Sequence, residues 1–126
     1  MTEIVYHPRA DDEVFESVRL YERSREGLGW RFLRALQRAE GRISDGPLVF
    51  PILREGIRKC PVRRFPFNVL FRVDAERVFV VAVAHHRRRP GYWLRRLRTS
   101  RRAESPKVPT TEQKPSSQRR IKTRRR

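Results

Sequence analysis

The stretch IRKCPVRRFPFNVLFRVDAERVFVVAVAH, residues 57–85, decides the fold of this chain. Apolar and polar residues alternate along it, and alternation places successive side chains of a strand on opposite faces of a sheet. Two breaks interrupt the pattern, at Phe65-Pro66 and at Asp74–Arg77. The stretch therefore predicts an antiparallel meander of three strands: Ile57–Arg64, Phe67–Val73 and Val78–His85.

The expected pairing of these strands gives the sheet two different faces. With Arg64 opposite Phe67 and Val73 opposite Val78, the first face is nearly all apolar and requires cover: Cys60, Val62, Phe67, Val69, Phe71, Val73, Val78, Val80, Ala82 and Ala84. The second face mixes cations with apolar side chains: Lys59, Arg63, Asn68, Arg72, Phe79, Val81, Val83 and His85. Because exposed apolar patches usually mark binding sites, we expect a partner to cover Phe79, Val81 and Val83.

Two helices are expected ahead of this meander. Thr2–His7 reads as a short strand, and Pro8 then favours the first turn of a helix that ends near Gly27. Apolar residues at helical spacing indicate a second helix over Gly29–Ile43. We expect the two helices to form a hairpin across the apolar sheet face, which makes the fold class α+β.

The segments on either side of the first meander strand are less regular. Gly and Pro recur through Ser44–Gly56, which predicts a loop that leads into the sheet. Pro61 cannot donate a hydrogen bond to a neighbouring strand, so we expect its strand to be an edge strand or to be bulged there.

The charge of the chain points to an anionic partner. The net charge of the 126 residues is +17, and nearly all of the cations are Arg, which binds phosphate with a bidentate fork. An Arg-rich codon bias would give the same composition. Residues 99–126 contain no aromatic residue and are rich in Pro, Ser, Thr, Lys and Arg, so we expect a disordered basic tail after one domain over residues 1–98.

The remaining composition excludes several classes of protein. A single cysteine, Cys60, rules out a disulfide within the chain, and its place on the apolar face predicts a core residue. No stretch resembles a secretory signal or a membrane span, so the cytoplasm is the expected location. We expect no metal site, because adjacent strand residues such as His85 and His86 diverge and His7 is the only further histidine. No cofactor is expected.

Four segments resemble the RelE/ParE superfamily of toxins from type II toxin–antitoxin systems. They are HPRADDE (7–13), GLGWRFLRAL (27–36), IRKCPVRRFPFNVLFRV (57–73) and VFVVAVAHHRRRPGYWLRRL (78–97). The resemblance covers about residues 3–97 and implies a helical hairpin on a mostly antiparallel sheet. It also implies a toxin that a cognate antitoxin holds inactive, and Phe79, Val81 and Val83 are then the expected antitoxin-binding residues.

The superfamily divides by target. RelE-like members cut mRNA on the ribosome, whereas ParE-like members inhibit DNA gyrase without catalysing a reaction. From the sequence we place translation first, through RNA binding and possible mRNA cleavage, and gyrase second. A non-toxic basic RNA-binding protein is a third alternative.

An mRNA-cutting site needs a proton acceptor, a proton donor and cations for the phosphate. The resemblance assigns Tyr92 to the catalytic region. Strand alternation favours His85 as the proton-transfer group, whereas spacing from Tyr92 favours His86, and a bulge at the strand end would reconcile the two. The candidate catalytic residues are therefore His85, His86, Tyr92 and Arg72.

The candidate substrate-binding residues are Lys59, Arg63, Asn68, Arg87 and Arg88. Asn68 stands where RelE-like nucleases carry an arginine, which weakens the case for cleavage. Tyr92 and Trp93 have an equally good structural interpretation, in which their rings pack the chain end onto the sheet.

Overall fold

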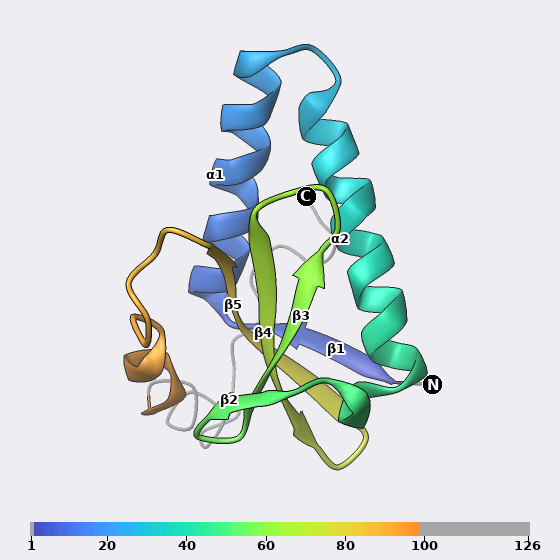
Figure 1. Ribbon diagram of the computed structural model, residues 1–126, viewed down its shortest axis with the longest axis vertical. Coiled ribbons are helices and arrows are strands. Elements are labelled where there is room, and N and C mark those ends of the chain that lie inside the picture. The colour runs from blue at the N-terminus through green and yellow to red at the C-terminus, as the bar shows by residue number, and fades with distance from the viewer. Residues whose placement is uncertain (1, 99–126) are drawn as a thin grey trace. The chain divides into compact units, whose positions relative to one another are not determined.

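The structure is a computed structural model that describes residues 2–98 (Figure 1). It has the predicted α+β architecture. The elements, in chain order, are β1 (Glu3–Tyr6), α1 (Pro8–Ser24), α2 (Leu28–Asp45), the short 3-10 helix η1 (Pro47–Val49), β2 (Ile52–Arg54), β3 (Ile57–Val62), β4 (Phe67–Asp74) and β5 (Arg77–His85). The chain divides into two units after Trp93, and residues 94–98 form one helical turn. The predicted tail, 99–126, lies outside the described residues.

The five strands form one sheet in the order β1-β5-β4-β3-β2. β1 runs parallel to β5, and the other neighbours are antiparallel, so the predicted meander is confirmed. Val73 lies opposite Val78 as expected, but the turn after β3 brings Val62, not Arg64, opposite Phe67. Because this shift is two residues, the side chains of β3 still lie on their predicted faces.

A bulge in β5 changes the faces beyond Val80. The register of β4 and β5 shifts between Leu70 and Phe71, so that Val80 pairs with Phe71 but Ala82 pairs with Leu70. The extra residue, Val81, reverses the alternation that follows it. Val83 and His85 therefore lie on the helix-covered face, and Ala82 and Ala84 lie on the other, opposite to the prediction for all four.

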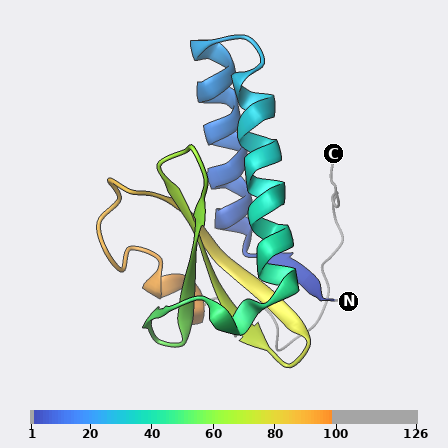
Figure 2. The same cartoon turned by 45° about the vertical axis from the view of Figure 1, so that its right-hand side comes forward.

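The two helices form the predicted hairpin along one face of the sheet (Figure 2). Glu22 of α1 caps the start of α2, where its carboxylate accepts hydrogen bonds from the backbone N–H of Gly27 (2.8 Å) and of Gly29 (3.0 Å). The helices approach closely at Gly29, where a Cβ atom would lie 2.7 Å from the carbonyl oxygen of Val18. Only glycine fits there, so residue 29 fixes the crossing of the hairpin.

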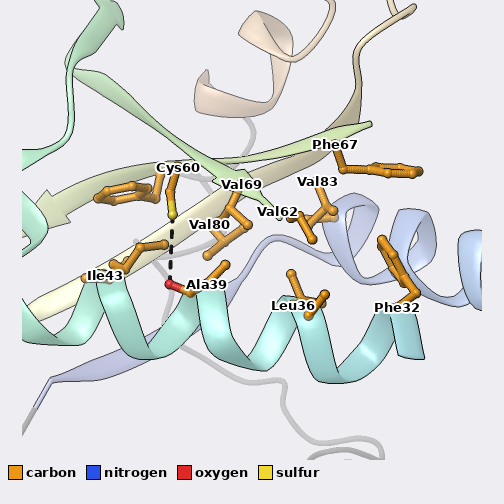
Figure 3. Packing of buried hydrophobic residues seen from close by; sticks show 14 residues of the cluster. Phe32, Leu36, Ala39, Ile43, Cys60, Val62, Phe67, Val69, Val80 and Val83 are labelled. Carbon is orange, nitrogen blue, oxygen red and sulfur yellow. Dashed lines mark hydrogen bonds between the residues drawn. The ribbon is translucent and has the colours of Figure 1, made fainter. Parts of the chain in front are cut away.

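The core lies between this hairpin and the sheet (Figure 3). From α2, Phe32, Leu36, Ala39 and Ile43 face the apolar side chains of the strands. Cys60 is buried among them, and its Sγ donates to the carbonyl oxygen of Ala39 at 3.9 Å. Burial raises the pKa of the Cys60 thiol. The predicted core role of Cys60 is confirmed.

The predicted loop over Ser44–Gly56 contains structure that the sequence pattern missed. It holds η1 and β2, and a tight turn with positive φ at Glu55 (54°) and Gly56 (74°) joins β2 to β3. β2 pairs with β3 only at Ile57 and Arg58. Pro61 therefore lies beyond the part of β3 that β2 covers, and its missing N–H leaves no gap in the ladder.

Candidate functional site

A pocket of about 350 Å³ lies beside the ends of β4 and β5. It brings together six of the predicted site residues: Lys59, Asn68, His85, His86, Arg88 and Tyr92. Leu53 and Arg54 of β2 and the segment 88–93 complete its wall, with Leu70 and Ala84 at the sheet. Four of the lining residues have cationic side chains, Arg54, Lys59, Arg88 and Arg89, and no carboxylate side chain lines the pocket. The arrangement suits an anionic group.

The two histidines lie differently at this pocket. The His85 ring packs edge-on against Phe67, with 5.0 Å between the ring centroids, and its Nδ1 accepts a hydrogen bond from the backbone N–H of Arg87 at 3.0 Å. His86 is exposed, and its backbone N–H donates to the carbonyl oxygen of Pro66 at 2.9 Å. Both histidines border the same pocket although they are adjacent in sequence.

Glu13 of α1 is the main polar residue that the sequence interpretation missed. Its Oε1 accepts a hydrogen bond from the backbone N–H of Val83 at 2.9 Å, and its Oε2 accepts one from the Tyr92 hydroxyl at 2.7 Å. β1 pairs with β5 only as far as Val80, and the Glu13 carboxylate binds β5 beyond that point. It thereby continues the hydrogen bonding of the edge after β1 ends.

A signal for this role was present in the sequence. Glu13 follows the buried Ala10 by three residues and precedes the buried Ser17 by four, which places its side chain on the sheet-facing side of α1. A carboxylate on a buried helical stripe requires a partner.

Tyr92 is held on two sides. Its hydroxyl donates to Glu13, and the Arg88 guanidinium lies 3.7 Å from the centroid of its ring. Arg88 also forms an ion pair with Glu13 at 3.7 Å. Trp93 is buried and borders the pocket. The contacts of Tyr92 and Trp93 agree with the structural interpretation, in which the two rings pack the segment after β5.

Three predicted site residues do not join the pocket. Arg72 forms an ion pair with Asp74 at 2.9 Å, and its guanidinium lies 4.9 Å from the centroid of the Phe79 ring. Arg63 is exposed in the β3–β4 turn, and Arg87 is exposed after β5. The sheet does not gather Arg72 with Lys59 as expected, because two-residue alternation fixes a face but not a position along the strand.

The prediction that Phe79, Val81 and Val83 form an exposed strip is wrong. Their side chains are 4%, 0% and 1% exposed. Val83 lies on the helix face because of the bulge, where it belongs to the core, and Phe79 contacts His7 edge-on at 6.2 Å between ring centroids. These three residues do not form an open surface in the described structure.

Two features are absent from residues 2–98, the described part of the chain. No group of three or more His, Cys, Asp or Glu in that range is placed to hold a metal ion. No helix in it has the length and apolar character required to cross a membrane.

The structure is that of a small α+β protein with a pocket lined by cationic side chains. Residues 4–90 match the family described as "ParE toxin of type II toxin-antitoxin system, parDE". The match covers more than half of the chain, and the chain therefore belongs to the ParE toxin family, within the RelE/ParE superfamily. As a member of a type II toxin–antitoxin family, it has the role of a toxin with an antitoxin partner.

Among solved structures, the chain resembles one described as "Chromosomal ParDE TA system from P. aeruginosa". The TM-score is 0.60 with 13% sequence identity, and the likeness covers 68% of this chain and 96% of that one. At this identity the likeness concerns the fold. No curated protein matches the chain in sequence.

Proposed function

We propose that this toxin inhibits growth by binding DNA gyrase and that it does not cut mRNA. The observation that carries the proposal is the position of Tyr92, whose hydroxyl is engaged by Glu13 and whose ring is covered by Arg88. Membership of the ParE toxin family supports the same target. This order reverses the one favoured by the sequence, which placed translation first.

Cleavage of RNA through its 2′-hydroxyl requires a proton acceptor, a proton donor and cations around one phosphate. In the described residues Arg72 is paired with Asp74 outside the pocket, and Asn68 replaces the arginine of RelE-like nucleases. A tyrosine that already donates to a carboxylate is poorly placed to donate to a leaving oxygen. The contacts therefore suit a packing role for Tyr92 better than a catalytic one.

Action on translation is the second candidate. The pocket favours it, because Lys59, His85 and His86 border one space that no carboxylate side chain lines. An exposed imidazole beside cations is a reasonable proton-transfer group.

The two candidates predict different effects of the substitution His86→Ala. His86 is exposed, so its loss should leave the fold intact. General acid–base catalysis typically contributes a factor of about 10²–10⁴. If the toxin cuts mRNA through His86, toxicity should fall on that scale, whereas a gyrase inhibitor should change by only a few fold. Arg87→Ala, an exposed neighbour that does not line the pocket, is the matched control.

The measurement is induction of the full chain without antitoxin, followed by assays of both targets. We expect loss of gyrase supercoiling activity and induction of the DNA-damage response, with transcripts intact. Cut mRNA ends that appear only when ribosomes are present, and that vanish in His86→Ala, would instead establish the second candidate.

A further inference from the structure

Six consecutive apolar residues, Leu48–Leu53, connect α2 to β3 through η1 and β2. Four of their side chains are exposed: Leu48 by 65%, Val49 by 80%, Ile52 by 56% and Leu53 by 46%. The other large apolar side chains exposed in the described part of the chain are Phe15, Leu20 and Trp30, all on the helices. We call residues 48–53 the apolar edge segment. Such a concentration of exposed apolar side chains indicates a binding surface.

Polar contacts of its backbone hold this segment in place. Arg58 donates hydrogen bonds to the carbonyl oxygens of Leu48 (3.1 Å) and Phe50 (2.7 Å). The backbone N–H of Lys59 donates to the carbonyl oxygen of Pro51 at 3.0 Å, and the Phe50 ring contacts Phe71 at 6.0 Å between centroids. The outward-facing side chains are therefore presented by an ordered backbone, which lowers the entropic cost of binding.

The segment also contains an open edge of the sheet. β2 is the last strand in the order β1-β5-β4-β3-β2 (Figure 1). It pairs with β3 at Ile52 and Arg54, and the register shifts between these two residues, so Leu53 is an extra residue without a pairing partner on β3. An end strand of this kind is a template for an additional strand.

The cations beside the apolar edge segment indicate which kind of partner binds there. Leu53 and Arg54 also line the basic pocket, together with Lys59, so the apolar edge segment leads directly into four cations. A second copy of this chain, whose net charge is also +17, would be repelled. A partner that carries carboxylates among apolar residues satisfies both parts of the surface.

We infer that the antitoxin adds an extended segment to β2, with apolar side chains on the apolar edge segment and carboxylates at Arg54 and Lys59. This inference rests on the proposed function, because it identifies the surface by which the toxin is neutralised. It also replaces the strip Phe79, Val81 and Val83, whose burial removes it as an open docking surface.

The test uses the full chain and the antitoxin encoded by the adjoining reading frame. Val49→Asp with Ile52→Asp should weaken antitoxin affinity by at least 30-fold, measured by calorimetry, and should leave toxicity without antitoxin unchanged. Leu20→Asp is the matched control, since Leu20 is 60% exposed on α1, and it should change affinity by less than threefold. Leu53→Pro should also weaken binding, because it removes the N–H of the residue that β3 leaves unpaired and does not change the charge.

Hydrogen exchange gives an independent readout. In the complex the amide of Leu53 should exchange at least tenfold more slowly than in the free toxin. Unchanged affinity in both edge variants, or protection confined to other elements, overturns the inference. A parent chain that sediments as a dimer and becomes monomeric in Val49→Asp/Ile52→Asp assigns the segment to self-association and also overturns it.

Results that contradict gyrase inhibition differ from results that contradict the antitoxin surface. If gyrase is not the target, supercoiling activity survives induction of the parent chain, yet the antitoxin affinities of the edge variants still decide the present inference. If the edge variants lose toxicity but keep antitoxin affinity, the segment binds the target instead, and the antitoxin assignment is wrong.

Discussion

The two faces of the sheet are closed in different ways. On the helix face, α1 and α2 cover a continuous apolar layer in which Phe32, Phe71 and Val80 are fully buried. At the pocket, the segment after β5 is held by a polar contact between the Glu13 carboxylate and the Tyr92 hydroxyl as well as by the buried Trp93. Apolar packing needs only a correct pattern of faces, whereas a polar contact needs particular atoms within about 3 Å. The helix face therefore follows from sequence periodicity, and the pocket does not.

The largest effect on stability is expected at the close contact between α1 and α2, the two helices that cover the sheet. Gly29→Ala places a methyl group against the Val18 carbonyl oxygen, an atom of a helix backbone that cannot rotate away. The helices must separate, and overpacking of this kind typically costs about 1–3 kcal/mol, with this backbone clash expected near the upper end. Urea denaturation of the two proteins measures the difference.

Gly41→Ala supplies the matched control. Gly41 is exposed in the same helix, and a Cβ atom there would meet nothing within 4 Å. Alanine should therefore stabilise the chain by about 0.5–1 kcal/mol, because it reduces the freedom of the unfolded state. Equal effects of the two substitutions would show that the close approach at Gly29 does not limit the hairpin.

The next largest effect on stability is expected at the pocket, where Glu13 and Tyr92 form a hydrogen bond. Glu13→Ala removes the acceptor for both the Val83 N–H and the Tyr92 hydroxyl, and we expect a loss of about 2 kcal/mol. Tyr92→Phe removes a single donor and should cost about 1 kcal/mol. In a double-mutant cycle the two changes should couple by at least about 0.5 kcal/mol, because they share one hydrogen bond. Strict additivity would mean that the bond contributes nothing to stability.

The contrast between the helix face and the pocket also explains which parts of the fold could be predicted from the sequence. Alternation in residues 57–85 and the apolar stripes of the helices predicted the meander, the hairpin, the buried Cys60 and the α+β class, because each depends on many residues that agree. β2 was missed, since three exposed residues between Pro51 and Glu55 have no period to detect.

The site was less predictable because single residues decide it. One extra residue at Val81 moved Val83 and His85 to the helix face, and no local signal distinguishes that valine from its neighbours. Arg72 shares a strand with Asn68, yet it is paired with Asp74 and is not part of the pocket wall. Glu13 lies 70 residues from the Val83 N–H that it binds, so only the tertiary fold brings the two together.

The smallest expected effect lies at a polar contact between β1 and α2, at the margin of the helix face. The Tyr6 hydroxyl of β1 donates to the Glu40 carboxylate of α2. Burial raises the pKa of Glu40, the Tyr6 hydrogen bond lowers it, and the nearby Asp11 charge raises it, with a net upward shift. Burial also raises the pKa of Tyr6 well above its ordinary value, and the Glu40 charge adds to this.

Glu40→Gln tests this contact through the pH dependence of stability. Because the pKa of Glu40 is higher in the folded than in the unfolded chain, the folded state binds more protons, and stability falls as pH rises through the interval between the two values. Glutamine cannot ionise but still accepts the Tyr6 hydrogen bond. The variant should therefore match the parent at acidic pH, below the ordinary pKa for glutamate of about 4.3, and exceed its stability at pH 7–8 by about 1 kcal/mol or less.

Tyr6→Phe should have the opposite effect on the pH dependence. It removes the hydrogen bond that favours ionised Glu40, so the stability of this variant should fall more steeply with rising pH than that of the parent. Thermal unfolding of the three proteins from pH 4 to pH 8 measures the trend. A parent that gains stability relative to Glu40→Gln as pH rises would show that the ionised carboxylate stabilises the helix face, contrary to the direction expected from burial.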